Sequence, residues 1–310
     1  MVKGNVGAYA SAAGAMFLVG TLAAVSGLVN GYPIYGGQAL RYALSAVLFL
    51  VIARVKQLPL LRPRRREVVL LIALAATGLV FFNIFVITAT RHAHPATIGT
   101  IIGAVPIVLA LAGPALSGAR PARHVVAAAV VVVAGTAITS GLGTADTAGI
   151  LLSVGALICE ACFTLLAIPL LTRLGPIRVS GYTAATAVPM LLVTSVITDG
   201  THALRAPTWP ELAGFLYLAI IVGGLAFLLW YGAMPRLGPD RAGLFAGLVP
   251  VGSITASALL GQATPTAFEL VGASIVVTGL LIGLAPRSSR PAHHPGGIKE
   301  LHTPTAGGTG

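Results

Sequence analysis

The stretch PATIGTIIGAVP, residues 95–106, returns in altered form as PDRAGLFAGLVP, residues 239–250. Both copies keep the pattern P-x3-G-x3-G-x-V-P, and equivalent positions lie 144 residues apart. Without a gap, 14 of the 44 positions from Pro95 to Ile138 are identical in the second copy. Because both copies lie in long apolar stretches, the repeat predicts a membrane protein built by duplication, as is typical of secondary transporters.

The composition agrees with a membrane protein. The chain is 56% hydrophobic and 9% charged, with a mean hydropathy of +0.93, whereas a typical soluble domain is about 25% charged. Two cysteines are too few for a disulfide framework. The first apolar stretch, residues 8–29, is longer than a typical signal-peptide core, so we interpret it as a retained membrane span.

Ten segments are long and apolar enough to cross a bilayer, which takes about 20 residues as a helix. We expect spans at 8–29, 37–53, 68–90, 95–116, 124–140, 149–171, 180–198, 212–234, 242–260 and 268–284. The predicted fold is an all-α integral membrane protein with ten transmembrane helices. It has two five-helix repeats, residues 1–145 and 146–286, and a disordered cytoplasmic tail, residues 287–310. Because five is odd, the second repeat crosses in the opposite sense. The repeat is therefore inverted, which is the physical basis of alternating access.

The basic residues predict the orientation. With the N-terminus inside, 16 of the 19 Lys and Arg residues fall on the inner side, leaving Arg41, Arg91 and Arg205. The positive-inside rule then places both termini in the cytoplasm. The run RPRRR, residues 62–66, is interpreted as a topology determinant beside anionic lipid, and not as a nucleic-acid site, despite the net charge of +11. The excess of Arg over Lys suggests a bacterial source, and hence the bacterial inner membrane.

Further stretches resemble a known family. They are G-x-V-P in both copies, Arg41 in ALRYALSAVLFL, FLLWYGAMPRLGPDRAG from Phe227, and ALLGQATPTAFELVGASIVVTGLLIG from Ala258. Over residues 8–285 the chain is similar to the EamA-like branch of the drug/metabolite transporter superfamily. The resemblance implies transport of small metabolites or drugs, often outward. The family often has Glu after the glycine that ends span nine, where this chain has Gln262, so a role for a charge there is not expected to carry over.

Glu160 lies near the middle of the predicted sixth span. A charge at the bilayer centre costs about 2.5–3.5 kcal/mol on insertion scales, so such residues usually face a cavity or a partner. We expect a proton carrier or a ligand for a cationic group; the alternative is a protonated side chain bonded to nearby backbone. Cys159 and Cys162 beside it are interpreted as packing residues, because a structural zinc site needs four ligands.

Five more residues are candidates for the substrate cavity: Asn83, Tyr231, Trp230, Tyr182 and Arg41. The aromatic residues serve either as interface anchors or as cavity walls. Arg41 either reaches the outer interface or points inward to a substrate carboxylate. The amide of Asn83 is difficult to explain by lipid contact, so we expect it inside the bundle.

The repeated motif supplies the hinge candidates. Pro106 and Pro250 each remove a backbone donor near mid-span, and Gly103 and Gly247 allow close helix contact. A break at the same depth in both repeats favours a hinge, while a packing kink alone remains the alternative.

The sequence predicts no cofactor, no metal site and no enzymatic activity. His92 and His94 are interpreted as part of a solvated turn, and no phosphate-binding loop is present. The expected partners are a small-molecule substrate, the lipid bilayer and, for a coupled mechanism, protons; a homodimer is left open. The predicted function is secondary transport, most simply export. A passive facilitator of the same fold and an integral membrane enzyme are the alternatives.

Overall fold

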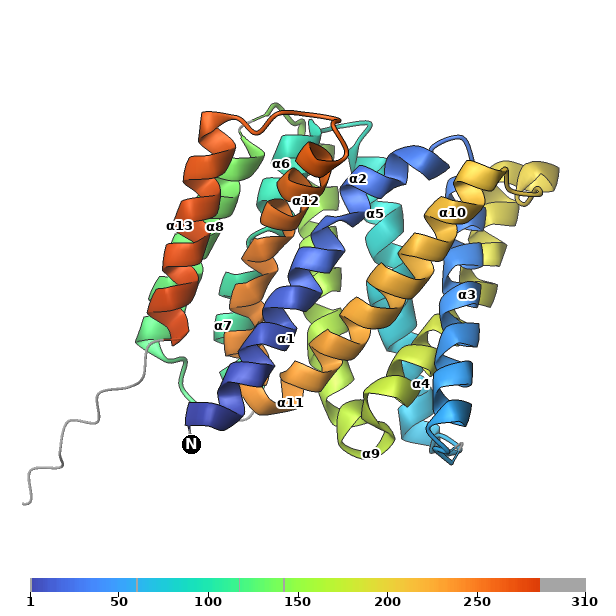
Figure 1. The fold of residues 1–310 in the computed structure, drawn as a ribbon, viewed down its shortest axis with the longest axis horizontal. Helices are drawn as coiled ribbons and strands as arrows, with labels where there is room; N and C mark the ends of the chain where they lie inside the picture. Colours follow the sequence, from blue (N-terminus) through green and yellow to red (C-terminus); the bar gives the residue numbers. More distant parts are fainter. Residues whose placement is uncertain (1, 60, 117, 142, 285–310) are drawn as a thin grey trace, which may run out of the picture.

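The computed structural model describes residues 2–59, 61–116, 118–141 and 143–284. The predicted tail, residues 287–310, lies outside this part of the chain. Within the described residues the structure is helical, apart from the connections and one isolated bridge between Ala93 and Ala145. The helices run side by side, and the start of α1 and the end of α13 lie at the same end of the bundle (Figure 1).

The first part of the chain, up to Ser140, forms the following helices. They are α1 (Val2–Gly20), α2 (Leu22–Ser26), η1 (Gly27–Val29), α3 (Ile34–Val55), α4 (Arg65–Ala75), the π-helix η2 (Ala76–Phe81), α5 (Phe82–Ala89), α6 (Pro95–Ile102), α7 (Val105–Leu116) and α8 (Arg123–Ser140).

The second part, from Thr147 onward, continues in a similar order. It contains α9 (Thr147–Asp199), η3 (Gly200–His202), α10 (Trp209–Tyr217), the π-helix η4 (Leu218–Ala226), α11 (Phe227–Leu244), η5 (Phe245–Gly247), α12 (Leu248–Leu259) and α13 (Ala267–Leu284).

Eight continuous helical segments of the described chain are long and apolar enough to cross a membrane. Six correspond to one predicted span each. The other two, 147–202 with 56 residues and 209–259 with 51 residues, each contain two predicted spans. Each is broken at a glycine with positive φ, Gly175 (72°) in α9 and Gly238 (76°) in α11. Glycine has no Cβ and adopts this backbone conformation without strain, so the chain can turn there.

Helix boundaries recur with the 144-residue offset of the sequence repeat. Helix α4 begins at Arg65 and α10 begins at Trp209, while α8 covers Arg123–Ser140 and α13 covers Ala267–Leu284. The two π-helices, η2 and η4, overlap under the same offset. Such π-turns are rare and often mark functional sites. The local structure therefore repeats without insertions.

Helices of the first part of the chain pack on helices of the second, most extensively α3 on α9 and α8 on α13, and α1 on α11 and α12 as well. The α8–α13 contact is made by backbone: a Cβ added to Gly135 would lie 2.7 Å from the Val276 nitrogen. On α13, a Cβ added to Gly272 would lie 2.7 Å from the Gly135 oxygen. Small residues at such interfaces are how membrane helices approach closely.

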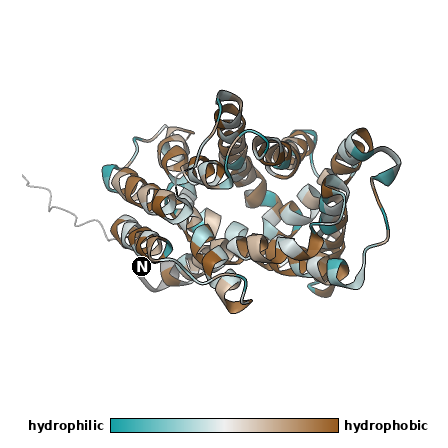
Figure 2. Cartoon of the chain, turned by 90° about the horizontal axis from the view of Figure 1, so that it is seen from above, coloured by the Kyte–Doolittle hydropathy of each residue, from teal (hydrophilic) through white to brown (hydrophobic). Residues whose placement is uncertain are grey.

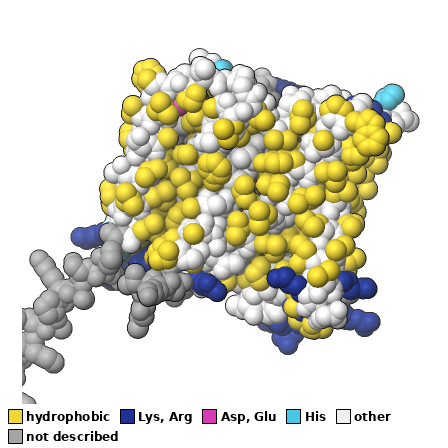
Figure 3. All heavy atoms as spheres, in the orientation of Figure 1, with side chains coloured by type: hydrophobic (Ala, Val, Ile, Leu, Met, Phe, Trp, Pro, Cys, Tyr) yellow, Lys and Arg dark blue, Asp and Glu magenta, His cyan; other side chains and the backbone are white. Residues whose placement is uncertain are grey.

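The outside of the bundle is apolar. Large side chains such as Val47, Ile197 and Leu281 are 59%, 79% and 67% exposed, and hydrophobic atoms cover the face shown in Figure 3. Viewed along the helices, hydrophilic residues lie mostly in the connections (Figure 2). Soluble monomers rarely expose apolar surface on this scale, so this belt is suited to lipid.

Lys and Arg side chains gather at one end of the bundle (Figure 3). We call this the basic end; it contains the α3–α4 connection, residues 56–64, and the turn of α9 at Gly175. The opposite end, called the far end, contains the connections of residues 27–33 and 200–208 (Figure 1).

Candidate functional site

Glu160 lies on the buried face of α9. Residues one turn or two turns away on the same face, Ser153, Ala156 and Thr164, are buried, whereas Leu151 and Ile158 on the opposite face are exposed. Glu160 itself is half-buried, deep within the bundle. Its carboxylate has no hydrogen-bond or ion-pair partner among the described residues. An unpaired carboxylate on an interior face is available to a proton or a ligand.

Aromatic side chains surround Tyr231 near this carboxylate. Tyr231 is fully buried, and its ring centroid lies 6.0 Å from that of Phe163 and 5.9 Å from that of Phe227. Its hydroxyl has no hydrogen-bond partner among the described residues, and Glu160 and Tyr42 are near enough to act on it electrostatically. The structure thus brings Glu160 and Tyr231 into one interior region.

Trp230 is 6% exposed and belongs to the main apolar core. Arg41 is also buried, at 5% exposed, so its side chain lies against other residues of the protein. Its Nη1 donates to Gln38 at 3.3 Å, and its guanidinium lies 5.1 Å from the Tyr42 ring centroid. Its Nε has no hydrogen-bond partner in the part of the chain that the structure describes. Arg41 therefore retains an unused donor inside the protein.

Two other candidates have structural uses. The Asn83 amide donates to the Leu79 carbonyl at 2.8 Å, directly after the π-turn of η2, so it stabilises that turn. The Tyr182 hydroxyl donates to the Leu61 carbonyl at 2.8 Å, in the connection at the basic end. The structure does not place Tyr182 beside Glu160.

The hinge candidates flank real breaks, but the prolines are not where the helices break. Helix α6 ends before Gly103, and α7 begins at Val105, so Pro106 lies in its first turn. Pro250 likewise lies in the first turn of α12, after η5. A proline in a first turn removes no helical hydrogen bond, since those donors are free in any helix. The interruptions therefore centre on Gly103 and Gly247, and both glycines pack on α8, where an added Cβ on either would approach Thr136.

At the basic end, side chains of α9 form hydrogen bonds with the α3–α4 connection and the start of α4. Arg173 donates to both carboxylate oxygens of Glu67 and, at 3.2 Å, to the Arg62 carbonyl. The Arg178 Nε donates to the Pro59 carbonyl at 2.9 Å. Together with Tyr182, these side chains tie residues 173–182 to residues 59–67.

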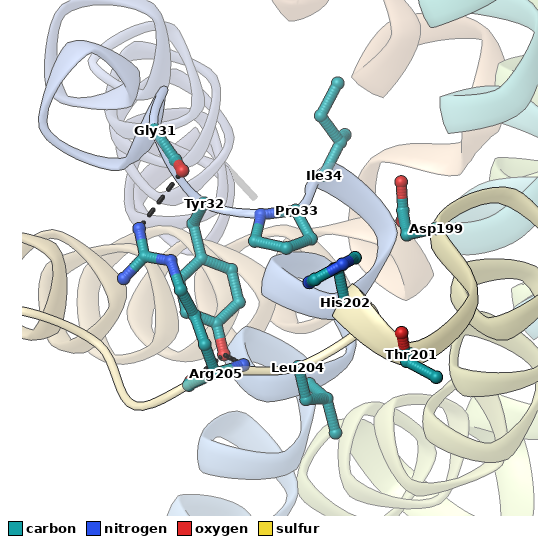
Figure 4. Close-up of a pocket in the computed structure, with 9 residues that line it drawn as sticks. All are labelled: Gly31, Tyr32, Pro33, Ile34, Asp199, Thr201, His202, Leu204 and Arg205. Atoms are coloured by element: carbon teal, nitrogen blue, oxygen red, sulfur yellow. Dashed lines mark hydrogen bonds between the residues drawn. The ribbon is translucent and has the colours of Figure 1, made fainter.

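At the far end, the segments equivalent to these two under the 144-residue offset also contact each other. Arg205 pairs with Glu211 and donates to the Gly31 carbonyl at 3.1 Å. The Tyr32 hydroxyl donates to the Arg205 carbonyl at 2.6 Å, and the guanidinium lies 4.9 Å from the Tyr32 ring centroid (Figure 4). The contact borders a pocket of about 650 Å³, into which Asp199 and His202 also project. Segments 31–38 and 203–211 are residues 175–182 and 59–67 moved by 144 positions.

A second connection at the far end joins the turn before α6 to the residues before α9. The His92 Nδ1 lies 3.0 Å from an Asp146 carboxylate oxygen, and the Gly149 amide donates to the other oxygen at 2.8 Å. These bonds hold the pKa of Asp146 below its usual range, the Gly149 amide first and His92 next. No group of three metal-ligating side chains occurs among the described residues.

The sequence profile of the EamA-like transporter family matches residues 147–284. These residues are similar to EamA-like transporters. The finding confirms the resemblance predicted from the sequence. The match covers α9 to α13 of this multi-pass membrane protein, the part that contributes Glu160, Tyr231 and Arg205.

Two curated relatives extend the similarity to the first half. The uncharacterized transporter YetK of Bacillus subtilis (strain 168) is 23% identical over 303 residues, 94% of this chain and 91% of the relative. The uncharacterized transporter YyaM of the same strain is 24% identical over 251 residues, 78% of this chain and 82% of the relative. One crystal structure has a TM-score of 0.77 at 21% identity, covering 90% of this chain and 96% of the other. That similarity shows a shared fold. The EamA-like domain and the two relatives support a membrane transporter.

The arginine–glutamate contacts at the two ends of the bundle were not predicted from the sequence. Glu67 and Glu211 are 144 residues apart, and each comes at the third helical position before an apolar run. Extending the repeat backward from Pro95 would have paired them. Their arginine partners carry no repeat signal, since Arg173 corresponds to Val29 and Arg205 to Leu61.

Proposed function

We propose that this chain is a secondary transporter that carries a small metabolite or drug-like molecule across the cytoplasmic membrane, in the direction of export and by alternating access. The EamA-like domain and the transporter relatives support the general function. The direction of transport and its mechanism are further parts of the proposal. Export follows from the family resemblance, and the mechanism follows from the repeat.

The proposed architecture has ten membrane crossings in two inverted repeats, residues 1–145 and 146–286. The turns at Gly175 and Gly238 divide the two long helical segments into two crossings each. The observation that carries the mechanism is the contact between equivalent segments at both ends: 59–67 with 173–182, and 203–211 with 31–38. This is the pattern that an in-plane two-fold axis produces, and it supports an exchange of conformation between the repeats.

We place the substrate in the interior near Glu160 and Tyr231. The buried Tyr231 hydroxyl has no hydrogen-bond partner among the described residues, which costs free energy unless a ligand or water satisfies it. The half-buried Glu160 carboxylate likewise has no described partner and is available to a proton or a ligand. The surrounding aromatic rings offer apolar contact area to an organic substrate. Glu160 is the proposed proton carrier if transport is coupled; a passive facilitator would use the same site without it.

Transport is tested in two steps. Metabolites in the medium are compared between cells that contain the protein and cells that lack it. The purified protein in liposomes is then given each differing metabolite in a counterflow assay, with empty liposomes as the control. We expect at least one compound to be exported by the cells and exchanged by the liposomes. No difference in the medium, or no exchange of any compound that differs, contradicts the proposal.

A further inference from the structure

Gln262, in the connection between α12 and α13, forms a hydrogen bond with α2 near the end of the first span. Its side-chain nitrogen donates to the Ala24 carbonyl at 3.0 Å, across 238 positions of sequence. Ala24 is a buried residue of α2, while Gln262 lies in the exposed connection between α12 and α13 at the far end (Figure 1). The bond therefore links the first half of the chain to the second half.

Two glycines make the contact beneath this bond unusually close. An added Cβ on Gly20 of α1 would collide with the Val249 carbonyl oxygen, and one on Gly252 of α12 would collide with the Phe17 carbonyl oxygen. The colliding atoms are backbone, so no side-chain rotation can relieve the overlap. Helices α1 and α12 thus cross in direct backbone contact. The Gln262–Ala24 hydrogen bond connects the same two parts of the chain just beyond this crossing.

The basic end cannot build the same closure. The 144-residue offset places Thr164 at the position of Gly20, Val108 at that of Gly252, and Gly118 at that of Gln262. Thr164 and Val108 have branched side chains that keep the two backbones apart. Gly118 has no side chain to donate a hydrogen bond. The arginine contacts recur at both ends, but this closure exists at the far end alone among the described residues.

We propose that Gln262, acting on a crossing formed by Gly20 and Gly252, is the gate residue of the far end and holds the empty transporter closed on that side. The inference rests on alternating access as the proposed function. In this mechanism α1 and α12 separate when the far end opens, and the Gln262 bond breaks. Gln262 is thus a positioning residue that sets how often the interior is reached from the far side.

The chemistry of the side chain gives a direct test. The neutral amide of Gln262 donates to the carbonyl at every pH at which the protein is folded. In Gln262→Glu, only the protonated carboxyl can donate, and the ionised form repels the carbonyl oxygen. The carboxylates on neighbouring elements are already bonded: Glu269 of α13 to Thr266, and Glu211 of α10 to Arg205. The closure in Gln262→Glu is therefore present at low pH and lost as the pH rises through the pKa of the new carboxyl.

The experiment measures access to the interior by labelling. Cys159 and Cys162 are replaced by Ser, and Met16, the counterpart of Glu160 under the 144-residue offset, is replaced by Cys as the reporter. A membrane-impermeant maleimide is applied to intact cells and to inside-out vesicles. The rate of labelling from the side that the far end faces reports its opening, and the other preparation serves as the control for orientation.

Gln262→Ala should raise the labelling rate from that side about two- to tenfold, the worth of one hydrogen bond. Relative to the parent at the same pH, Gln262→Glu should label at the parental rate below about pH 4 and at the Gln262→Ala rate at pH 8, because a free glutamate has a pKa of about 4.3. Gly252→Ala should open the far end further, whereas Gly232→Ala, where an added Cβ meets nothing within 4 Å, should change nothing.

Parental labelling of Gln262→Ala, or a ratio of the Gln262→Glu rate to the parental rate that does not depend on pH, overturns the inference. If Gly252→Ala does not fold, the Gln262→Ala and Gln262→Glu variants still test the inference. The readout needs no substrate, so it separates the gate from the transport proposal. If the variants change the labelling rate but no compound is transported, the gate inference holds and the transport proposal fails. If a compound is transported but the labelling rate does not change, the transport proposal holds and the gate inference fails.

Discussion

Glu67 and Glu211 perform the same two tasks at opposite ends of the bundle, 144 residues apart. Each accepts a 2.7 Å hydrogen bond from the backbone amide three residues earlier, on Arg64 and Thr208, and so caps its helix. Each also binds an arginine guanidinium through both carboxylate oxygens. In both cases the guanidinium reaches a backbone carbonyl in the first half of the chain, at Arg62 or Gly31. One carboxylate therefore connects the start of a helix to the contact between the halves.

The first prediction concerns the arginines of these two contacts. Arg173→Ala and Arg205→Ala each remove the guanidinium bond between the halves, to the Arg62 or the Gly31 carbonyl, but leave the helix cap of the glutamate intact. We expect each variant to lower the melting temperature in detergent by several degrees. Arg236, an exposed residue that donates no hydrogen bond among the described residues, provides the matched control, and Arg236→Ala should melt with the parent. Equal melting of all four proteins would show that the contacts do not hold the halves together.

The repeat and the apolar periods were enough to predict an all-helical membrane protein, and each predicted span overlaps an observed helical segment. The exact form of the breaks was harder to predict. Pro106 suggested that the fourth span breaks at the proline, but the chain breaks at Gly103 and Ala104 and restarts with Pro106 in the first turn. A proline signals that a helix boundary is near, and only the local backbone decides on which side.

The candidate site was predictable only in part, for a physical reason. Glu160 could be singled out because a carboxylate in an apolar run is costly wherever it points. Tyr182 could not be placed, because a tyrosine is stable both inside the bundle and at an interface, and its hydroxyl binds Leu61 at the basic end. The Gln262–Ala24 bond joins residues 238 positions apart, and no local pattern encodes such a contact.

The second prediction tests the α8–α13 contact. Gly272→Ala places a methyl group against the Thr139 nitrogen and the Gly135 oxygen, which are backbone atoms and cannot rotate away. Overpacking of this kind costs about 1–3 kcal/mol. We expect a lower melting temperature and a lower yield of folded protein. Gly7→Ala, where an added Cβ meets nothing within 4 Å, is the control. If the two variants are equally stable, α8 and α13 do not depend on this close approach.

The third prediction concerns topology. The basic end carries the positively charged connections, and α1 begins and α13 ends there (Figure 1). By the positive-inside rule we expect this end to face the cytoplasm. A reporter active only outside the cytoplasm should be inactive when fused after Leu284 and active when inserted between Thr264 and Pro265, in the connection at the far end. Strong activity of the Leu284 fusion would reverse the orientation.

The fourth prediction concerns Asp146 and pH. The Gly149 amide and His92 hold the pKa of Asp146 below its usual range, about 4 for a free aspartate. A lowered pKa means that the ionised carboxylate stabilises the fold above the ordinary pKa, and that this stabilisation disappears as the pH falls through the lower native pKa. Asp146→Asn should therefore melt below the parent at pH 7, and the difference should shrink below about pH 4. A difference that is constant with pH would mean that the charge of Asp146 contributes nothing.

The last prediction concerns Glu160 as the proton carrier. Ser153, Ala156 and Thr164 place Glu160 on the buried face of α9, and no described residue forms a hydrogen bond with its carboxylate. Glu160→Gln keeps the shape of the side chain and can still form hydrogen bonds, but it cannot release a proton. In liposomes loaded with an identified substrate, we expect the variant to lose accumulation driven by a pH gradient, and to keep substrate exchange at equal pH on both sides. Glu269→Gln is the matched control, because Glu269 lies at the start of α13 and already accepts hydrogen bonds from Thr266; this variant should be driven by the gradient like the parent. A Glu160→Gln protein that still accumulates substrate along the gradient would assign the coupling elsewhere, and a parent that never responds to the gradient would leave a passive facilitator.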